Sequence, residues 1–555
     1  MHADFLFRNL RYAAAAMCVI APAVPAGAQQ TPQTEERTGR PAIEITLEEA
    51  VRRAVENNPE LEIVRLEAQV GAAHVNVAET AYSPIFSSIL GRSSSVVPPS
   101  SFLLGERAVD TNDWFSSTGV RQRLPWGAGT WSASWDASRT TTDSPLTSFD
   151  PSMQAGLQLG FSQPLLKDFK TDPVRHQYVI AQRDQTSSEL RLREAVVQTV
   201  AAVKQAYWSL KASLANVTVQ QRSLELAQQL VTQNKARVDV GQAPPLDLVQ
   251  AEAEAAARRE SLIRATAAAE DAEDHLRRLI INPSDVGFWR VRLDPVDQPS
   301  GRVALPDVDA TVAAALEQRY DVARARHDEG TASKNVEFFR NQKLPDLRLQ
   351  TSYRGSGIGG TQLIRTGEFP GEITQRLTRG YGDVLSQVFA SDYPTWSLGV
   401  TLSYTLGESY EEASQARAEI QRRQAAQRVA SLQLQAAEAI RQAARQVRST
   451  AEREDAARAG ATLAEQRYES EQRRYEVGLS TSFLVTQSQR DLAQAQVNLL
   501  QAMLDYQSSL VSFEALQLAP PLAAGDRIGL NGAEIVLVPT GTPAGIFRSN
   551  SGGGF

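Results

Sequence analysis

The sequence predicts a mainly helical protein with a smaller β portion, built from long coiled-coil helices and a membrane-spanning sheet. Three observations predict this fold: a long heptad pattern, an order of segments that occurs twice, and alternating strands placed between the helices. The chain has 555 residues, which is more than one hydrophobic core usually serves, so we expect several structural regions.

The N-terminus has the features of a secretory signal peptide. Arg8 and Arg11 precede an apolar stretch that is too short to span a bilayer, and small residues then lead to a cleavage site before Gln29. Cys18, the only cysteine, lies inside this stretch. We therefore expect residues 1–28 to be removed and the mature chain to contain no thiol. The alternative is a buried N-terminal helix.

Composition argues against several classes of function. The formal net charge is −7, without the basic stripe that nucleic-acid-binding proteins carry. Five scattered histidines, no phosphate-binding loop and no catalytic triad argue against a metal, a cofactor or enzymatic activity. After the signal, no segment has the apolar length of a transmembrane helix, which leaves a periplasmic, extracellular or outer-membrane barrel protein.

One order of segments occurs twice along the chain. An amphipathic helix is predicted over residues 46–81 and is stopped by Pro84, and a second one over residues 307–342 is stopped by Pro345. Further on, the sequence RVDVG ends at Gly241 and RYEVG ends at Gly478, and a helix follows each glycine. The expected regions are a linker at 29–45, repeat 1 at 46–295, repeat 2 at 296–518 and a Gly- and Pro-rich tail at 519–555.

Two segments, at about residues 172–240 and 410–477, predict very long helices. About 70 helical residues would span roughly 105 Å, which no ordinary globular domain needs. The half-length helices on either side of the strands, of about 36 and 39 residues, add up to about the same length. This predicts a uniform wall of helices, whereas an ordinary antiparallel coiled coil explains only the heptads. The expected seams are Val196, Val203, Leu210, Val217, Leu224, Val231 and Val238, and the thinner Ile440, Ala444, Val447 and Ala451.

Between the helices the apolar period changes to two. The alternation is clear at residues 157–162, 347–353 and 396–404, and weaker at 85–91. Such strands suit an outer-membrane barrel and equally a half-buried soluble sheet. Four strands are too few to close a barrel with a useful lumen. We therefore expect a trimer whose three chains share one barrel of about twelve strands.

Other features of the strand regions concern the membrane surface. Residues 355–381 are expected to form Gly-rich external loops. An additional hairpin at 115–136 exceeds the four-strand plan, and whether it extends the barrel or forms an external loop is open. Trp114, Trp126, Trp131, Trp135 and Trp396 lie in or beside these regions, and tryptophan is enriched at membrane interfaces.

Over residues 46–518 the sequence resembles the TolC family of outer membrane efflux proteins. The most specific residues are 475–480 (YEVGLS), and 163–166 (QPLL) are a second match. The resemblance implies a homotrimer in the outer membrane, with a shared twelve-stranded barrel and a periplasmic helical barrel. It also implies docking to a periplasmic adaptor protein and an inner-membrane pump.

The function implied is a passive exit duct for small molecules in a tripartite efflux system. One alternative within transport is the exit duct of type I protein secretion. An alternative from another class is a trimeric coiled-coil adhesin or periplasmic scaffold.

The resemblance also implies two groups of site residues. At the entrance, Tyr475 matches a tyrosine that holds the coils closed and Asp247 matches its acidic partner, whose basic partner would fall at Ser480. Leu484 and Gln487 stand where the best-known members carry a ring of lumenal aspartates, so no acidic filter is expected. The adaptor-docking tip is expected at Val240, Gly241, Val477, Gly478, Leu479 and Ser480, less securely at the first turn because Gln242 replaces the usual leucine.

Overall fold

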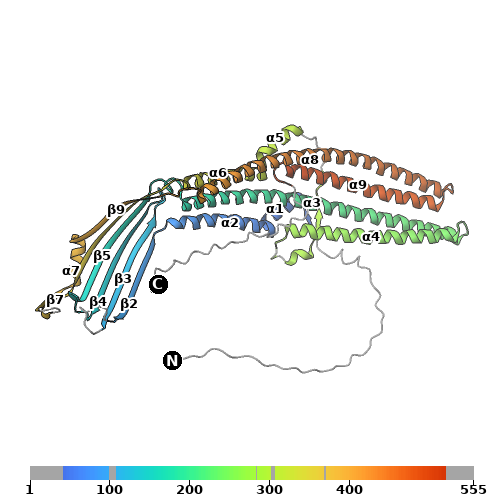
Figure 1. The fold of residues 1–555 in the computed structure, drawn as a ribbon. Helices are drawn as coiled ribbons and strands as arrows, with labels where there is room; N and C mark the ends of the chain where they lie inside the picture. Colours follow the sequence, from blue (N-terminus) through green and yellow to red (C-terminus); the bar gives the residue numbers. More distant parts are fainter. Residues whose placement is uncertain are drawn as a thin grey trace, which may run out of the picture.

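A computed structural model describes residues 42–98, 108–282, 284, 286–299, 301, 307–367 and 371–520. The expected signal peptide and nearly all of the expected tail lie outside the described residues. The described chain is one elongated body, with a β-sheet at one end and long helices that reach to the other end (Figure 1).

Two long helices run through most of this body, as the heptad pattern predicts. α3 (Pro173–Asp239) and α8 (Tyr410–Glu476) have 67 residues each, so each spans roughly 100 Å. Both begin at a side-chain cap: Asp172 accepts hydrogen bonds from the backbone N–H groups of the first turn of α3, and Ser409 does the same for α8.

The shorter helices lie alongside the long ones in a single layer. α2 and α4 contact one side of α3, while α6 and α9 lie between α3 and α8. The half-length helices therefore stack end to end beside a full-length neighbour, as their lengths predict. Their bounds are α1 (Leu47–Asn57), α2 (Pro59–Glu79), α4 (Pro245–Ile280), α5 (Val308–Gln318), α6 (Tyr320–Gln342) and α9 (Ser482–Leu516).

The expectation of one continuous helix at 46–81, and of another at 307–342, is wrong. The first breaks at Asn58, because Pro59 disfavours a helical backbone in the residue before it. The second breaks at Arg319, whose backbone is extended although no proline follows. Arg319 instead forms a buried ion pair of 2.7 Å with Asp321 and donates to the backbone carbonyl of Leu516. The breaks fall at equivalent positions of the two halves.

The main core lies midway along the helical layer. Val203, Tyr207 and Leu210 of α3 are fully buried against Leu276 of α4. Strand β1 (Ala42–Ile45) also packs here, parallel to β6 (Arg292–Pro295), so the end of the expected linker is a strand. In the second half, Ile440, Ala444 and Val447 of the expected seam are buried.

The sheet is wider than expected. Its order is β2-β3-β4-β5-β7, all antiparallel, and the far side of β7 pairs with β9 near the helices and with β8 further out. The expectation of four strands per chain is therefore wrong. The bounds are β2 (Ile85–Val97), β3 (Val109–Arg123), β4 (Thr130–Thr142), β5 (Phe149–Pro164), β7 (Asp346–Thr366), β8 (Glu372–Arg379) and β9 (Tyr393–Ser403).

Two segments account for this width: the additional hairpin at 115–136 and the expected external loop at 355–381. The hairpin at 115–136 is the main part of β3 and β4, and it is paired on both sides within the sheet. The expected external loop at 355–381 is instead the outer part of β7 followed by β8. A short helix, α7 (Tyr381–Ala390), then leads back to β9. Strand pairing provides backbone hydrogen bonds to the described strand residues of both segments. The glycine and serine content of these segments had suggested loops.

The two faces of the sheet differ in polarity, as the alternation predicts. One row of paired residues across all six strand positions is apolar, and the adjacent row on the other face is largely polar. The apolar row is Phe86, Val120, Ala133, Leu159, Tyr353 and Trp396. The polar-face row is Ile85, Arg121, Ser132, Gly160, Ser352 and Ser397.

Helix α7 packs on the apolar face of the sheet. Val384 and Val388 of α7 are buried there against Ala155. Glycines on β7 make this possible, since a Cβ at Gly357 would lie only 2.4 Å from the backbone oxygen of Val384. No helix in the described part of the chain has the length and apolar character needed to cross a bilayer.

Candidate functional site at the helical tip

The far end of the helical layer is formed by two equivalent turns, the tip (Figure 1). Gly241 and Gly478 have φ angles of 71° and 80°, a conformation that side chains other than glycine adopt at a cost. The N–H of Gly241 donates to Val238, and the N–H of Gln242 donates to Arg237 at 2.7 Å. Gly478 and its successor make the same two bonds, so both turns are Schellman caps.

Apolar side chains project from these turns. Val240, Val477 and Leu479 are 68%, 69% and 72% exposed. Contiguous exposed apolar residues commonly mark a surface where another protein binds. We call this set the apolar tip; it comprises Val240, Leu246, Val249, Val477, Leu479, Phe483 and Leu484, all exposed.

Tyr475 does not project from the tip; it is buried just behind it. Its hydroxyl donates to Oδ1 of Asn234 at 2.5 Å. Asn234, itself fully buried, donates to Ser482 Oγ at 2.7 Å and to the backbone oxygen of Asp247 at 3.1 Å. One polar network thus joins the ends of α3, α4, α8 and α9.

A cation completes this network. The guanidinium of Arg237 lies 4.1 Å from the centre of the Tyr475 ring and donates to the Tyr475 backbone oxygen at 3.0 Å. Asp247 takes part through its backbone carbonyl, and Ser480 donates to the carboxylate of Glu471 in its own hairpin. Inside one chain the tip is therefore held by the neutral hydrogen bonds of Asn234, by charge-assisted hydrogen bonds of Arg237 and Glu471, and by a cation–π contact.

The expected lumenal positions lie on the first turns of α9. Leu484 is exposed, and Gln487 donates to Asp491 at 2.8 Å. Asp491 also forms an ion pair of 3.1 Å with Arg467. The carboxylate that Gln487 contacts is therefore already paired within the chain, and neither Leu484 nor Gln487 supplies an acidic group.

A buried carboxylate links α4 and α9, the two helices that follow the tip turns. Glu254 of α4 forms ion pairs with Arg258, at 2.7 Å, and with Arg490 of α9. Burial raises the pKa of Glu254, but hydrogen bonds from Arg490 and Arg258 outweigh it and leave the pKa below its ordinary value. Glu254 is thus ionised at neutral pH and cross-links α4 to α9.

Sequence reasoning missed Asn234, Arg237, Glu254 and Arg490. One signal was available for Asn234, which lies three residues after the seam residue Val231 and so faces the same side of the helix. A polar residue at such a position predicts a buried hydrogen-bond partner. The partner itself, Tyr475, lies 241 residues away and could not be read from the pattern.

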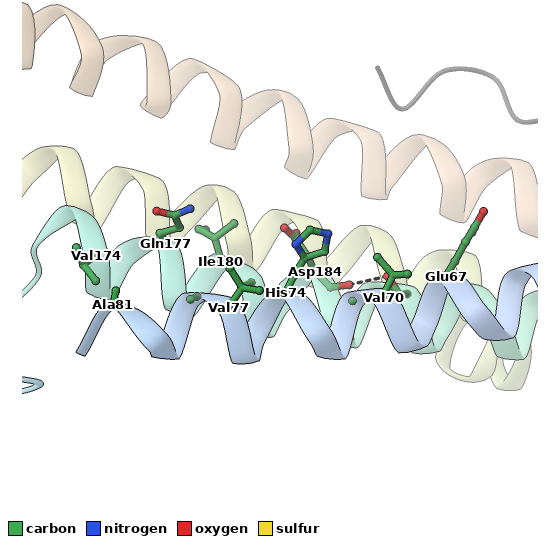
Figure 2. Close-up of a pocket in the computed structure, with 13 residues that line it drawn as sticks. Glu67, Val70, His74, Val77, Ala81, Val174, Gln177, Ile180 and Asp184 are labelled. Atoms are coloured by element: carbon green, nitrogen blue, oxygen red, sulfur yellow. Dashed lines mark hydrogen bonds between the residues drawn. The ribbon is translucent and has the colours of Figure 1, made fainter. Parts of the chain in front are cut away.

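A hollow of about 570 Å³ lies between α2 and α3, near the sheet (Figure 2). Val70 and Val77 line it from α2, and Val174 and Ile180 line it from α3. Within the described residues, no group of His, Cys, Asp or Glu could hold a metal ion. The polar side chains of Glu67, His74 and Asp184 also line the hollow.

A single layer of long helices that carries a two-faced sheet at one end defines a class of membrane channel proteins. The profile of the family described as outer membrane efflux protein matches residues 122–280 and 311–517, more than half of the chain. The chain belongs to this family, which confirms the resemblance read from its sequence.

Solved structures agree with this assignment at the level of the fold. The CmeC outer membrane channel of Campylobacter jejuni shares 16% identity, with a TM-score of 0.62, over 85% of each chain. VceC of Vibrio cholerae shares 16% identity, with a TM-score of 0.59, over 85% of this chain and 96% of its own. The open-state MtrE outer membrane channel of Neisseria gonorrhoeae shares 18% identity, with a TM-score of 0.57, over 85% of this chain and 89% of its own. No curated protein sequence gives a significant match.

Proposed function

We propose that the protein is the outer-membrane exit duct of a tripartite efflux system. Small molecules would pass passively from an inner-membrane pump through the helical part and leave through the sheet region. The observation that carries this proposal is the joining of a two-faced sheet to helices that span roughly 100 Å. In this arrangement the sheet crosses the outer membrane and the helices extend into the periplasm.

The open edges of the helical layer support assembly into a homotrimer. α2 with α4 forms one edge and α8 forms the other. Both edges carry exposed apolar residues, which would be covered if α8 of one copy packed against α2 and α4 of the next. These residues are Ile63, Leu66, Val70, Val77 and Ile263 on one edge, and Ile420, Leu434 and Leu463 on the other.

The apolar tip is the surface that would receive the periplasmic adaptor. Val477 and Leu479 project from a hydrogen-bonded Schellman cap, so little backbone freedom would be lost when a partner binds. At the first turn, Gln242 is followed by Ala243 and two prolines, which offer a smaller apolar contact than Leu479.

The proposal is tested in cells of the organism that encodes the protein. Deleting the gene should raise the accumulation of a fluorescent efflux substrate several-fold, and the wild-type gene should restore export. A double variant, Val477→Asp with Leu479→Asp, should fail to restore it at normal protein levels. If deletion leaves accumulation unchanged and abolishes secretion of a polypeptide, the protein is a secretion duct instead.

A further inference from the structure

We propose that β2 of one copy pairs with β9 of the next and that, with three copies, this closes a barrel of about eighteen strands. The inference rests on the proposed function, because it assumes that the sheet crosses a membrane in a trimer. It departs from the twelve strands that the sequence and the family resemblance led us to expect.

The argument begins with two unpaired sheet edges. Among the described strands, β2 pairs only with β3, and β9 pairs only with β7. The outer edge of each strand therefore presents a row of free backbone N–H and C=O groups. A bilayer offers these groups no hydrogen bonds, so a sheet that crosses it must close on itself or on another chain.

The chain cannot close this sheet alone. Six strand positions are too few for a barrel with an open interior. The remaining described strands, β1 and β6, lie in the core of the helical layer and pair with each other. The partner for each edge must then come from another copy.

The two edges fit each other in direction and length. β2 leaves the helical layer directly after α2, while β9 returns to it directly before α8, so the strands of neighbouring copies would be antiparallel. β2 has 13 residues and β9 has 11. β2 starts and β9 ends at the border between the sheet and the helices. The two strands would therefore lie at the same depth in the membrane.

The side chains at the two edges continue the same faces. Trp396 and Leu398 of β9 are 72% and 65% exposed, and Phe86 and Leu90 of β2 are 67% and 75% exposed. All four belong to the apolar face, because Phe86 and Trp396 lie in one row of paired residues. Pairing β2 with β9 would therefore extend a continuous apolar surface towards lipid.

The β3–β4 hairpin is a full part of this wall. Its strands are paired along their length with β2 and β5. Its turn is fixed at the helical border, where Gln163 donates to the backbone oxygen of Gly127 at 2.6 Å and Arg123 pairs with Asp172 at 3.3 Å. The hairpin therefore adds two strands per copy, and the barrel is wider than a twelve-stranded one.

The test is cysteine cross-linking of the full-length protein in its own membrane. Ser87→Cys on β2 is combined in turn with Thr395→Cys, Ser397→Cys and Thr401→Cys on β9, all on the polar face. At least one pair should form disulfide-linked dimers and trimers after mild oxidation. Ser134→Cys on the inner strand β4, combined with the same β9 positions, is the matched control and should form none.

The number of strands is then obtained from the mass of the detergent-purified protein. A three-copy mass together with β2–β9 cross-links supports the proposal. A two-copy mass with the same cross-links would mean twelve strands and overturn it, as would a three-copy mass without a cross-link at any β9 position. Export in the efflux assay is a separate readout, so the closure can fail while the proposed function stands.

Discussion

At the scale of single residues, a buried polar network lies just behind the exposed tip. Asn234 is fully buried and bonds to Tyr475, Ser482 and Asp247 at once. A fully satisfied network of this kind stabilises one geometry, and the loss of one partner leaves a buried polar atom unpaired. The proposed entrance should therefore respond to changes in Tyr475 more than to changes in the exposed tip residues.

We expect Tyr475→Phe to loosen the entrance. The change keeps the ring beneath Arg237 but removes the hydrogen bond to Asn234, at a cost of about 1–3 kcal/mol because the Asn234 oxygen stays buried. Single-channel conductance in planar bilayers should rise modestly. Asp247→Ala should have a smaller effect, because Asp247 joins the network through its backbone.

The opposite conductance result would show that a different contact keeps the proposed entrance closed. If Tyr475→Phe conducts like the wild type while Asp247→Ala opens the pore, a charge contact of the Asp247 carboxylate holds the entrance. The buried hydroxyl of Tyr475 would then be only part of the packing of α8 against α3.

A second residue-scale prediction concerns Glu194, a buried carboxyl of α3. Burial raises its pKa above the ordinary value, although Arg324 lies 3.0 Å away. A raised pKa means that Glu194 favours folding below its unfolded pKa, and that this stability is lost as pH rises through the folded pKa. Glu194→Gln should therefore raise the free energy of unfolding at pH 7 relative to wild type.

Thermal unfolding followed by circular dichroism in detergent checks this prediction. The difference between Glu194→Gln and wild type should shrink as the pH falls towards 4. An equal difference at both pH values would show that titration of Glu194 is not the cause.

At the scale of elements, glycine has opposite roles at the end and in the middle of α8. Gly478→Ala should destabilise the hairpin by about 1–2 kcal/mol, since alanine is strained at a φ of 80°. Space is not the cause, because apart from the adjoining residues no atom lies within 4 Å of the position where a Cβ would stand. Gly460, inside the helix, is equally unobstructed, so Gly460→Ala should stabilise by about 0.5–1 kcal/mol.

Hydrogen exchange along α8 and at the start of α9 measures both variants. Faster exchange in Gly478→Ala, with slower exchange around residue 460 in Gly460→Ala, is the expected pair of results. Equal effects of the same sign would mean that the backbone angle at Gly478 does not control the turn.

At the scale of the whole molecule, the proportions predict that the membrane lies around one end only. The helices span roughly 100 Å, while strands of 13 to 16 residues suit a bilayer when they are tilted. In a lipid nanodisc, the helical part should project on one side by roughly 100 Å. Electron microscopy of such particles decides this, and a particle that projects equally on both sides would contradict it.

Much of the fold was predictable because its signals are local. The expected long helices at 172–240 and 410–477 match α3 and α8 within one residue at each end, and the two glycines marked the turns. The duplication was visible because Pro84 and Pro345 act on the backbone next to them. The family match then confirmed the resemblance carried by residues 475–480.

The features that sequence reasoning missed depend on distant partners. Arg319 breaks a helix through its ion pair with Asp321 and its bond to Leu516. The β3–β4 hairpin joins the sheet because β2 and β5 pair with its two strands. Helix α7 lies where glycines on β7 leave room for it.

The sequence by itself therefore determined the long helices, their turns and the order of segments in both halves, because periodicity, proline and glycine act over a few residues. Only the tertiary structure decided the width of the sheet, the place of α7 and the network around Asn234. Those depend on backbone and side-chain groups that find their hydrogen-bond partners, such as Tyr475 for Asn234, across more than two hundred residues of chain.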